Sequence, residues 1–84
     1  MKFKHGDRII YIGSIIETFH NQVGTIWDYR YARLARITPV FYFEHELKSG
    51  KKFFVLFDNK DIRGSFKLLP ICVYNIELIK YYEI

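Results

Sequence analysis

Residues 40–58 read VFYFEHELKSGKKFFVLFD, and this stretch holds the clearest hairpin pattern in the chain. Two runs rich in aromatic and β-branched side chains flank the sequence Lys-Ser-Gly-Lys at 48–51. Aromatic and β-branched side chains fit a pleated, half-buried surface, and Gly50 can supply the positive φ that a tight turn requires. We therefore expect strands over 40–46 and 52–58, joined by a hairpin turn.

The same pattern continues on both sides of this stretch. Turn-forming residues recur at short intervals, and the runs between them are too short for most helices. Further strands are expected over 8–12, 23–31 and 77–81, the last one after a turn that begins at Pro70 and includes a 3₁₀ turn over 71–74. With only Ala32 and Ala35 as alanines, the chain is predicted to be all-β, a small barrel or a sandwich, with at most one short helix.

One segment departs from the β pattern, because residues 29–36 read YRYARLAR and place arginines at 30, 33 and 36. In a helical turn, positions spaced by three share one face, so the three guanidinium groups would lie together. In an extension of the second strand, Arg33 would point away from the other two. The aromatic flanks and Pro39 favour an extended or looped path, and the helical turn is the alternative.

The stretch from Phe3 to Ile26 reads FKHGDRIIYIG, then a polar loop, then NQVGTI. It resembles the opening of SH3-like small barrels, especially the KOW domains of ribosomal and transcription-elongation proteins, and is similar to the small SH3-like protein of the photosystem I reaction centre. In those families a Gly-Asp pair precedes the first strand, and a loop leads to a Val-Gly-Thr-Ile second strand. The matching residues are Gly6, Asp7, Ile9, Val23, Gly24, Thr25 and Ile26.

The chain's ending also resembles such barrels, since Leu69-Pro70 precedes the closing strand at 77–79. The resemblance implies one five-stranded SH3-like barrel over residues 1–84. The segment from Tyr29 to Val40 is longer than the usual link between the second and third strands, so this barrel would carry a long, basic link there. Gly24 would allow a sharp bend and let another backbone approach closely.

Composition bounds the class of protein. The 84 residues carry 13 Lys and Arg against 9 Asp and Glu, a net charge of +4. The longest apolar run is 53–57, far below the roughly 18 residues of a membrane span, so no membrane partner is expected. The apolar run after Lys2 and Lys4 is interrupted at 13–14 without a cleavage site. We expect a cytoplasmic protein, or one of an organelle stroma or matrix, that is not secreted. The excess of amino acids encoded by AT-rich codons, such as Phe, Tyr, Ile and Lys, indicates a phage, low-GC bacterial, organellar or protozoan origin.

No catalytic or metal-binding motif is evident, and we expect no enzyme, no cofactor and no small-molecule substrate. Glu44-His45-Glu46 resembles a ligand cluster, but strand alternation would point His45 away from both glutamates. The lone cysteine, Cys72, excludes an internal disulfide and a Cys-based zinc site and is expected to be a buried apolar group rather than a reactive thiol. The remaining histidines and the serines lie in separate segments or expected turns: His5, His20, Ser14, Ser49 and Ser65.

The aromatic side chains divide into two expected groups. Most phenylalanines of the predicted central hairpin belong in the core: Phe41, Phe43, Phe53, Phe54 and Phe57. Sixteen aromatic residues, 19% of the chain, exceed what so small a barrel buries, so some rings should be exposed. The candidates for exposed rings are Trp27, Tyr29, Tyr31, Tyr42, Tyr81 and Tyr82. An exposed aromatic cluster marks a recognition surface, whereas single tyrosines capping a barrel with wet hydroxyls are the alternative.

The basic segment is the main functional feature, since its three arginines carry +3 of the net +4. Guanidinium groups pair with phosphates and aromatic rings stack on bases, so we expect a non-catalytic module that docks on nucleic acid or a nucleoprotein complex. Because Arg and Tyr also dominate protein interfaces, the alternative is a small accessory subunit or phage-type inhibitor that binds an acidic protein. The candidate contact residues are Trp27, Tyr29, Arg30, Tyr31, Arg33, Arg36, Lys48, Lys51 and Lys52, with Lys60, Arg63 and Lys67 extending the positive field.

Overall fold

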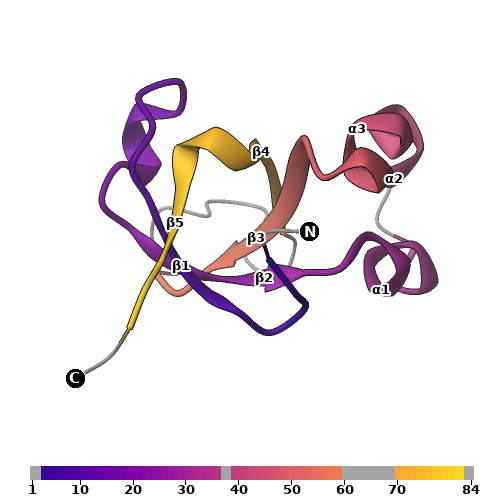
Figure 1. Ribbon diagram of the computed structural model, residues 1–84, viewed down its shortest axis with the longest axis horizontal. Helices are drawn as coiled ribbons and strands as arrows, with labels where there is room; N and C mark the ends of the chain where they lie inside the picture. Colours follow the sequence, from indigo (N-terminus) through magenta and orange to yellow (C-terminus); the bar gives the residue numbers. More distant parts are fainter. Residues whose placement is uncertain (1–2, 37–38, 60–69, 83–84) are drawn as a thin grey trace.

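The computed structural model describes residues 3–36, 39–59 and 70–82 (Figure 1). Within these residues, five strands form one antiparallel sheet in the order β4-β3-β2-β1-β5. The strands are β1 (Arg8–Tyr11), β2 (Val23–Trp27), β3 (Lys52–Phe57), β4 (Ile71–Tyr74) and β5 (Leu78–Lys80). Three short helices lie between β2 and β3: α1 (Tyr29–Leu34), α2 (Pro39–Tyr42) and α3 (Glu44–Ser49). Two 3₁₀ turns complete the described elements, η1 (Glu17–Phe19) and η3 (Asn75–Glu77).

The sheet curls because its two edge strands are neighbours in the chain. β4 and β5 lie at opposite edges, yet only the three residues of η3 join them. Across a flat five-stranded sheet the edges would lie about 19 Å apart, whereas a three-residue 3₁₀ turn advances by only about 6 Å. The sheet therefore curls so that its two edges approach at η3 (Figure 1). Next to this corner the Ile12 amide donates to the Glu77 carbonyl at 2.8 Å, which extends the pairing of β1 with β5.

The main core lies inside this curl and follows the two-residue alternation of the strands. From β3, Phe53, Val55 and Phe57 all point inward. The Phe3 ring meets Phe53 edge-on with centroids 5.3 Å apart, and Phe19 from η1 stacks on Phe57 at 4.5 Å. The other buried members of this core are Ile9, Tyr11, Ile26, Val73 and Leu78.

A second, smaller core covers the opposite face of β3. Phe54 points outward from the curl and is nevertheless fully buried, because Ala32 of α1, Val40 of α2 and Leu47 of α3 pack on it. The three helices accordingly lie together at one end of the molecule, on the right in Figure 1. This helical cover explains how β3 can bury apolar side chains on both faces.

Gly24 has the close backbone approach that we expected of it. It lies in β2 opposite Phe57 of β3, and a Cβ atom on it would stand 2.9 Å from the Leu56 carbonyl oxygen and 2.5 Å from a Val55 methyl group. Any side chain there would push the two strands apart. Hence the Val-Gly-Thr-Ile pattern has a steric basis in this sheet.

The expected strand over 40–46 and the expected hairpin at 48–51 are both wrong. Residues 39–49 form α2 and α3, and Gly50 (φ +80°) ends α3 in the left-handed conformation rather than turning a hairpin. Val40 of α2, Leu47 of α3 and Phe43 between the two helices all pack toward Phe54. The aromatic composition of this segment had favoured a strand, but the segment folds as two helices whose apolar side chains cover Phe54. The prediction of at most one short helix is wrong for the same reason.

The other expected strands agree more closely with the observed ones. The expected first strand, the one over 52–58 and the closing one are confirmed to within a few residues, but the second ends at Trp27 instead of residue 31. Beyond it the helical alternative for the arginine segment is confirmed, and the extended path is wrong, because Asp28 caps α1. The expected 3₁₀ turn over 71–74 is wrong as well: those residues form β4, paired with β3, and the 3₁₀ turn follows it.

Candidate functional site

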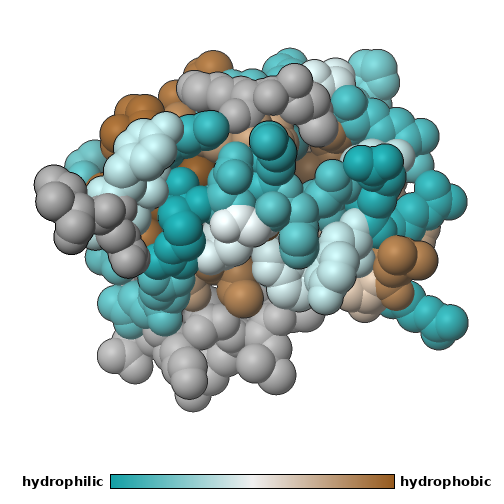
Figure 2. All heavy atoms as spheres, turned by 60° about the horizontal axis from the view of Figure 1, so that its bottom comes forward, coloured by the Kyte–Doolittle hydropathy of each residue, from teal (hydrophilic) through white to brown (hydrophobic). Residues whose placement is uncertain are grey.

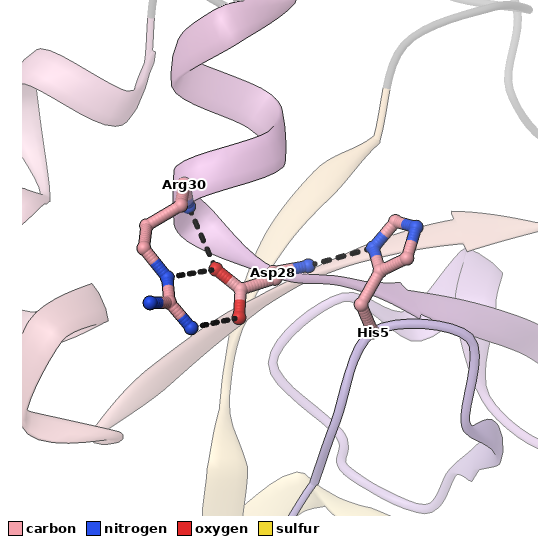
Figure 3. A network of polar contacts seen from close by, with 3 residues as sticks. All are labelled: His5, Asp28 and Arg30. Carbon is pink, nitrogen blue, oxygen red and sulfur yellow. Dashed lines mark hydrogen bonds and ion pairs between the residues drawn. The ribbon is translucent and has the colours of Figure 1, made fainter.

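Helix α1 begins at a polar cap that also holds the first arginine of the basic segment (Figure 3). The Asp28 carboxylate accepts a 2.8 Å hydrogen bond from the Arg30 amide and lies 3.4 Å from the Arg30 Nε. Burial favours a raised pKa for Asp28, but the hydrogen bond from the Arg30 amide and the nearby Arg30 guanidinium outweigh it and hold this pKa below its ordinary value. The Arg30 side chain remains 78% exposed, so its guanidinium is held in place yet open to a ligand.

The second arginine links α1 to α3 through a shared carboxylate. Glu44 of α3 lies 3.5 Å from the Arg33 guanidinium and 3.2 Å from the Lys48 ammonium. Two positive charges thus flank one negative charge, and the pair of helices keeps a positive excess along this side. Exposed ion pairs of this kind contribute little to stability.

The two other candidate lysines differ in their surroundings. Lys51 is exposed just after α3. Lys52 is half-buried, and its ammonium lies over two rings, 3.9 Å from the Phe43 centroid and 4.5 Å from that of Tyr74. Cation–π contacts hold this charge against the protein, so Lys52 is less suited to bind phosphate than sequence position suggested. Lys60, Arg63 and Lys67, with Ser65, lie outside the described residues.

The third arginine has an unusual backbone. Arg36 follows the end of α1 with φ +59°, the left-handed conformation that favours glycine after a helix. Arg30, Arg33 and Arg36, from here on called the α1 arginines, line an open depression together with Tyr29 and Leu34. Leu34 is 84% exposed within this basic surrounding, and Figure 2 shows hydrophilic side chains around hydrophobic ones at this end of the molecule.

The candidate rings divide differently from our expectation. Tyr31, Tyr42, Tyr81 and Tyr82 are exposed as expected. Trp27 and Tyr29 were expected to be exposed but are half-buried, because both pack against the smaller core under α1. Among the phenylalanines expected in the core, the prediction for Phe41 is wrong, because its side chain is exposed on α2.

Sequence reasoning missed His5 as part of this surface. The His5 ring lies 4.5 Å from the Tyr31 ring at a tilt of 33°, and its Nδ1 accepts a 3.1 Å hydrogen bond from the Asp28 amide. Trp27 meets Tyr31 edge-on at 5.2 Å. Twenty-three residues separate His5 from Asp28, and no local pattern marks contacts over that distance. We call His5, Trp27 and Tyr31 the ring cluster.

Cys72 and the segment from Glu44 to Glu46 were the other candidates for chemistry. Cys72 is half-buried beside the smaller core, and burial raises the pKa of its thiol to about 11. Glu44 to Glu46 lie on α3 rather than on a strand, so the alternation argument used for His45 does not apply. Among the described side chains, no group of three His, Cys, Asp or Glu residues is placed to hold a metal ion.

No protein-family model matches the chain, and no curated protein or solved structure matches it significantly. In the part of the chain that the structure describes, no helix has the length and apolar character needed to cross a bilayer.

Proposed function

We propose that this protein is a non-catalytic binding module, built on an SH3-like barrel, that docks on nucleic acid or a nucleoprotein complex through the α1 arginines. Two features support the barrel. The strand order β4-β3-β2-β1-β5 places consecutive strands side by side except for the last, and a single 3₁₀ turn returns the chain to pair β5 with β1. The helices between β2 and β3 take the place of the long basic link.

The observation that carries the binding role is the placement of three arginines around one open depression. Guanidinium groups match phosphate oxygens bidentately, and α1 together with the turn that follows it places all three around the same depression. Arg36 supports this role further, because its left-handed backbone conformation costs an arginine free energy that it would not cost a glycine. Strained positions of this kind gather at binding sites.

A protein partner with acidic side chains is the second candidate, and Leu34 is the observation that favours it. Its side chain is 84% exposed among the arginines, and Phe41 is exposed on the neighbouring α2. Apolar groups ringed by arginines suit a protein surface that offers both carboxylates and an apolar pocket. In that case the same guanidinium groups pair with carboxylates.

Binding of labelled RNA and DNA, measured by fluorescence anisotropy at several salt concentrations, tests the proposal. Each phosphate contact lowers the slope of log K against log salt by about 0.9 on duplex and about 0.7 on single strands. Replacing all three α1 arginines with glutamine should therefore make this negative slope shallower by about two to three units. Lys80→Gln, which removes one exposed charge from β5, is the control and should leave it nearly unchanged.

If the wild-type protein binds neither RNA nor DNA at low salt, the nucleic-acid proposal falls. A slope that the triple variant leaves unchanged would place the contacts elsewhere on the molecule. If no nucleic acid binds, a protein partner is sought by affinity capture, with the triple variant as the negative bait.

A further inference from the structure

The ring cluster forms a preorganised aromatic surface beside the α1 arginines. Its members come from three parts of the chain: His5 from the loop before β1, Trp27 from the end of β2 and Tyr31 from α1. Tyr31 contacts both partners, at 4.5 Å and 5.2 Å between ring centroids. Even so, half of Tyr31 (51%) stays exposed, and His5 is exposed as well.

A backbone hydrogen bond fixes the orientation of this surface. In Figure 3 the His5 ring points at the Asp28 amide, which donates to its Nδ1 at 3.1 Å. Asp28 also caps α1 through its carboxylate and orients the Arg30 guanidinium. The ring pair and the neighbouring guanidinium are therefore positioned by one residue, which lowers the entropy cost of ordering them on a ligand.

We infer that Tyr31 with His5 is a stacking platform for an unpaired base, and that the ligand class of this module is single-stranded nucleic acid. This inference rests on the proposed function. A half-exposed ring that packs against His5 offers a π-face that any unpaired base can stack on. The exposed Arg30 guanidinium on the same helix would supply a phosphate contact.

Duplex nucleic acid fits the same surface less well. Paired bases are already stacked on their neighbours and present no free face to Tyr31. Helix α1 has only six residues, and the Asp28 carboxylate caps its N-terminal end. A negative charge at that position opposes insertion of the helix start between two phosphate backbones. The platform therefore favours strands whose bases are unpaired.

The test compares a fluorescein-labelled 15-nucleotide oligothymidine with a 15-base-pair duplex that contains the same labelled strand, at low salt. We expect the single strand to bind more tightly. Tyr31→Ala should weaken binding of the single strand by about tenfold or more, while leaving the duplex affinity within about twofold, since alanine preserves the helix. Tyr31→Phe keeps the ring and should retain the affinity, and Tyr82→Ala, an exposed ring at the other end of the chain, is the matched control.

Emission of Trp27, the single tryptophan, provides a second readout because it lies against Tyr31. The single strand should change this emission in the wild-type protein and much less in Tyr31→Ala. Equal binding of duplex and single strand, or full affinity in Tyr31→Ala, would overturn the platform while leaving the proposed function in place. Absence of all nucleic-acid binding would overturn both.

Discussion

The phenolic hydroxyl of Tyr11 donates a 2.8 Å hydrogen bond to the carboxylate of Glu77 inside the main core. Tyr11 is fully buried and Glu77 is 7% exposed, so neither group exchanges this contact freely for water. The same hydroxyl accepts a 3.1 Å hydrogen bond from the Ile16 amide. Desolvation raises the pKa of Tyr11, and Glu77 adds to the rise against the opposing effect of the Ile16 amide. The pair joins β1 to η3, the 3₁₀ turn between the two edge strands of the sheet.

Removing the Tyr11 hydroxyl should destabilise the fold. Tyr11→Phe leaves the ring in the core but deprives the buried Glu77 carboxylate of this donor, and an unsatisfied buried polar group costs about 1–3 kcal/mol. Urea unfolding followed by Trp27 emission measures the loss. Tyr82→Phe removes an exposed hydroxyl and should leave the midpoint unchanged. Equal midpoints for the two variants would mean that the Tyr11 bond contributes nothing.

Gly24→Ala should also lower stability, for a steric reason. The added methyl group would meet the Leu56 carbonyl at 2.9 Å and a Val55 methyl at 2.5 Å, so β2 and β3 must separate locally. Overpacking of this kind costs about 1–3 kcal/mol. Gly6→Asn is the matched glycine control, because Gly6 has positive φ but open space around its Cβ position, and asparagine tolerates that conformation. Thermal unfolding that ranks Gly6→Asn below Gly24→Ala would contradict the close packing.

The Cys72 thiol should react slowly in the folded protein. With its pKa raised to about 11 by burial, only about one thiol in a thousand is ionised at pH 8, and the thiolate is the reactive form. Iodoacetamide labelling, followed by mass spectrometry, should accelerate about tenfold per pH unit up to the pKa and far more on addition of urea. Fast labelling of the native protein at pH 7 would show that the thiol is neither shielded nor raised in pKa.

Arg36→Gly should separate stability from binding. Glycine adopts the left-handed backbone at Arg36 without strain, so the variant should gain about 1 kcal/mol of stability. The same change removes one charge from the α1 arginines and should reduce the salt slope by about 0.7–0.9. Arg33→Gln, at a regular helical position, should reduce the slope without the gain in stability. A more stable Arg36→Gly that keeps the wild-type slope would remove Arg36 from the contact surface.

Local pattern was sufficient for the strands whose neighbours in the chain are turns. β1, β3 and β5 are short runs of β-branched or aromatic residues next to turn residues, and the alternation of Phe53, Val55 and Phe57 already indicates an inward face. The three-residue spacing of the α1 arginines likewise contained the helical alternative. The spacing alone did not distinguish this helix from an extended strand, because the helix depends on Asp28 as its N-cap.

The amino-acid sequence was sufficient to predict a small β-rich fold and to place most of the net positive charge in residues 30–36, since composition, strand period and charge spacing are local properties. The helices within residues 39–49 depend on packing between distant segments, because the aromatic composition suited either state until Phe54 required a cover on the outer face of β3. The tertiary structure also decided the site, since His5 meets Asp28 and Tyr31 only after β1 and β2 have paired. Contacts between distant segments form through packing, and no periodicity along the chain records them.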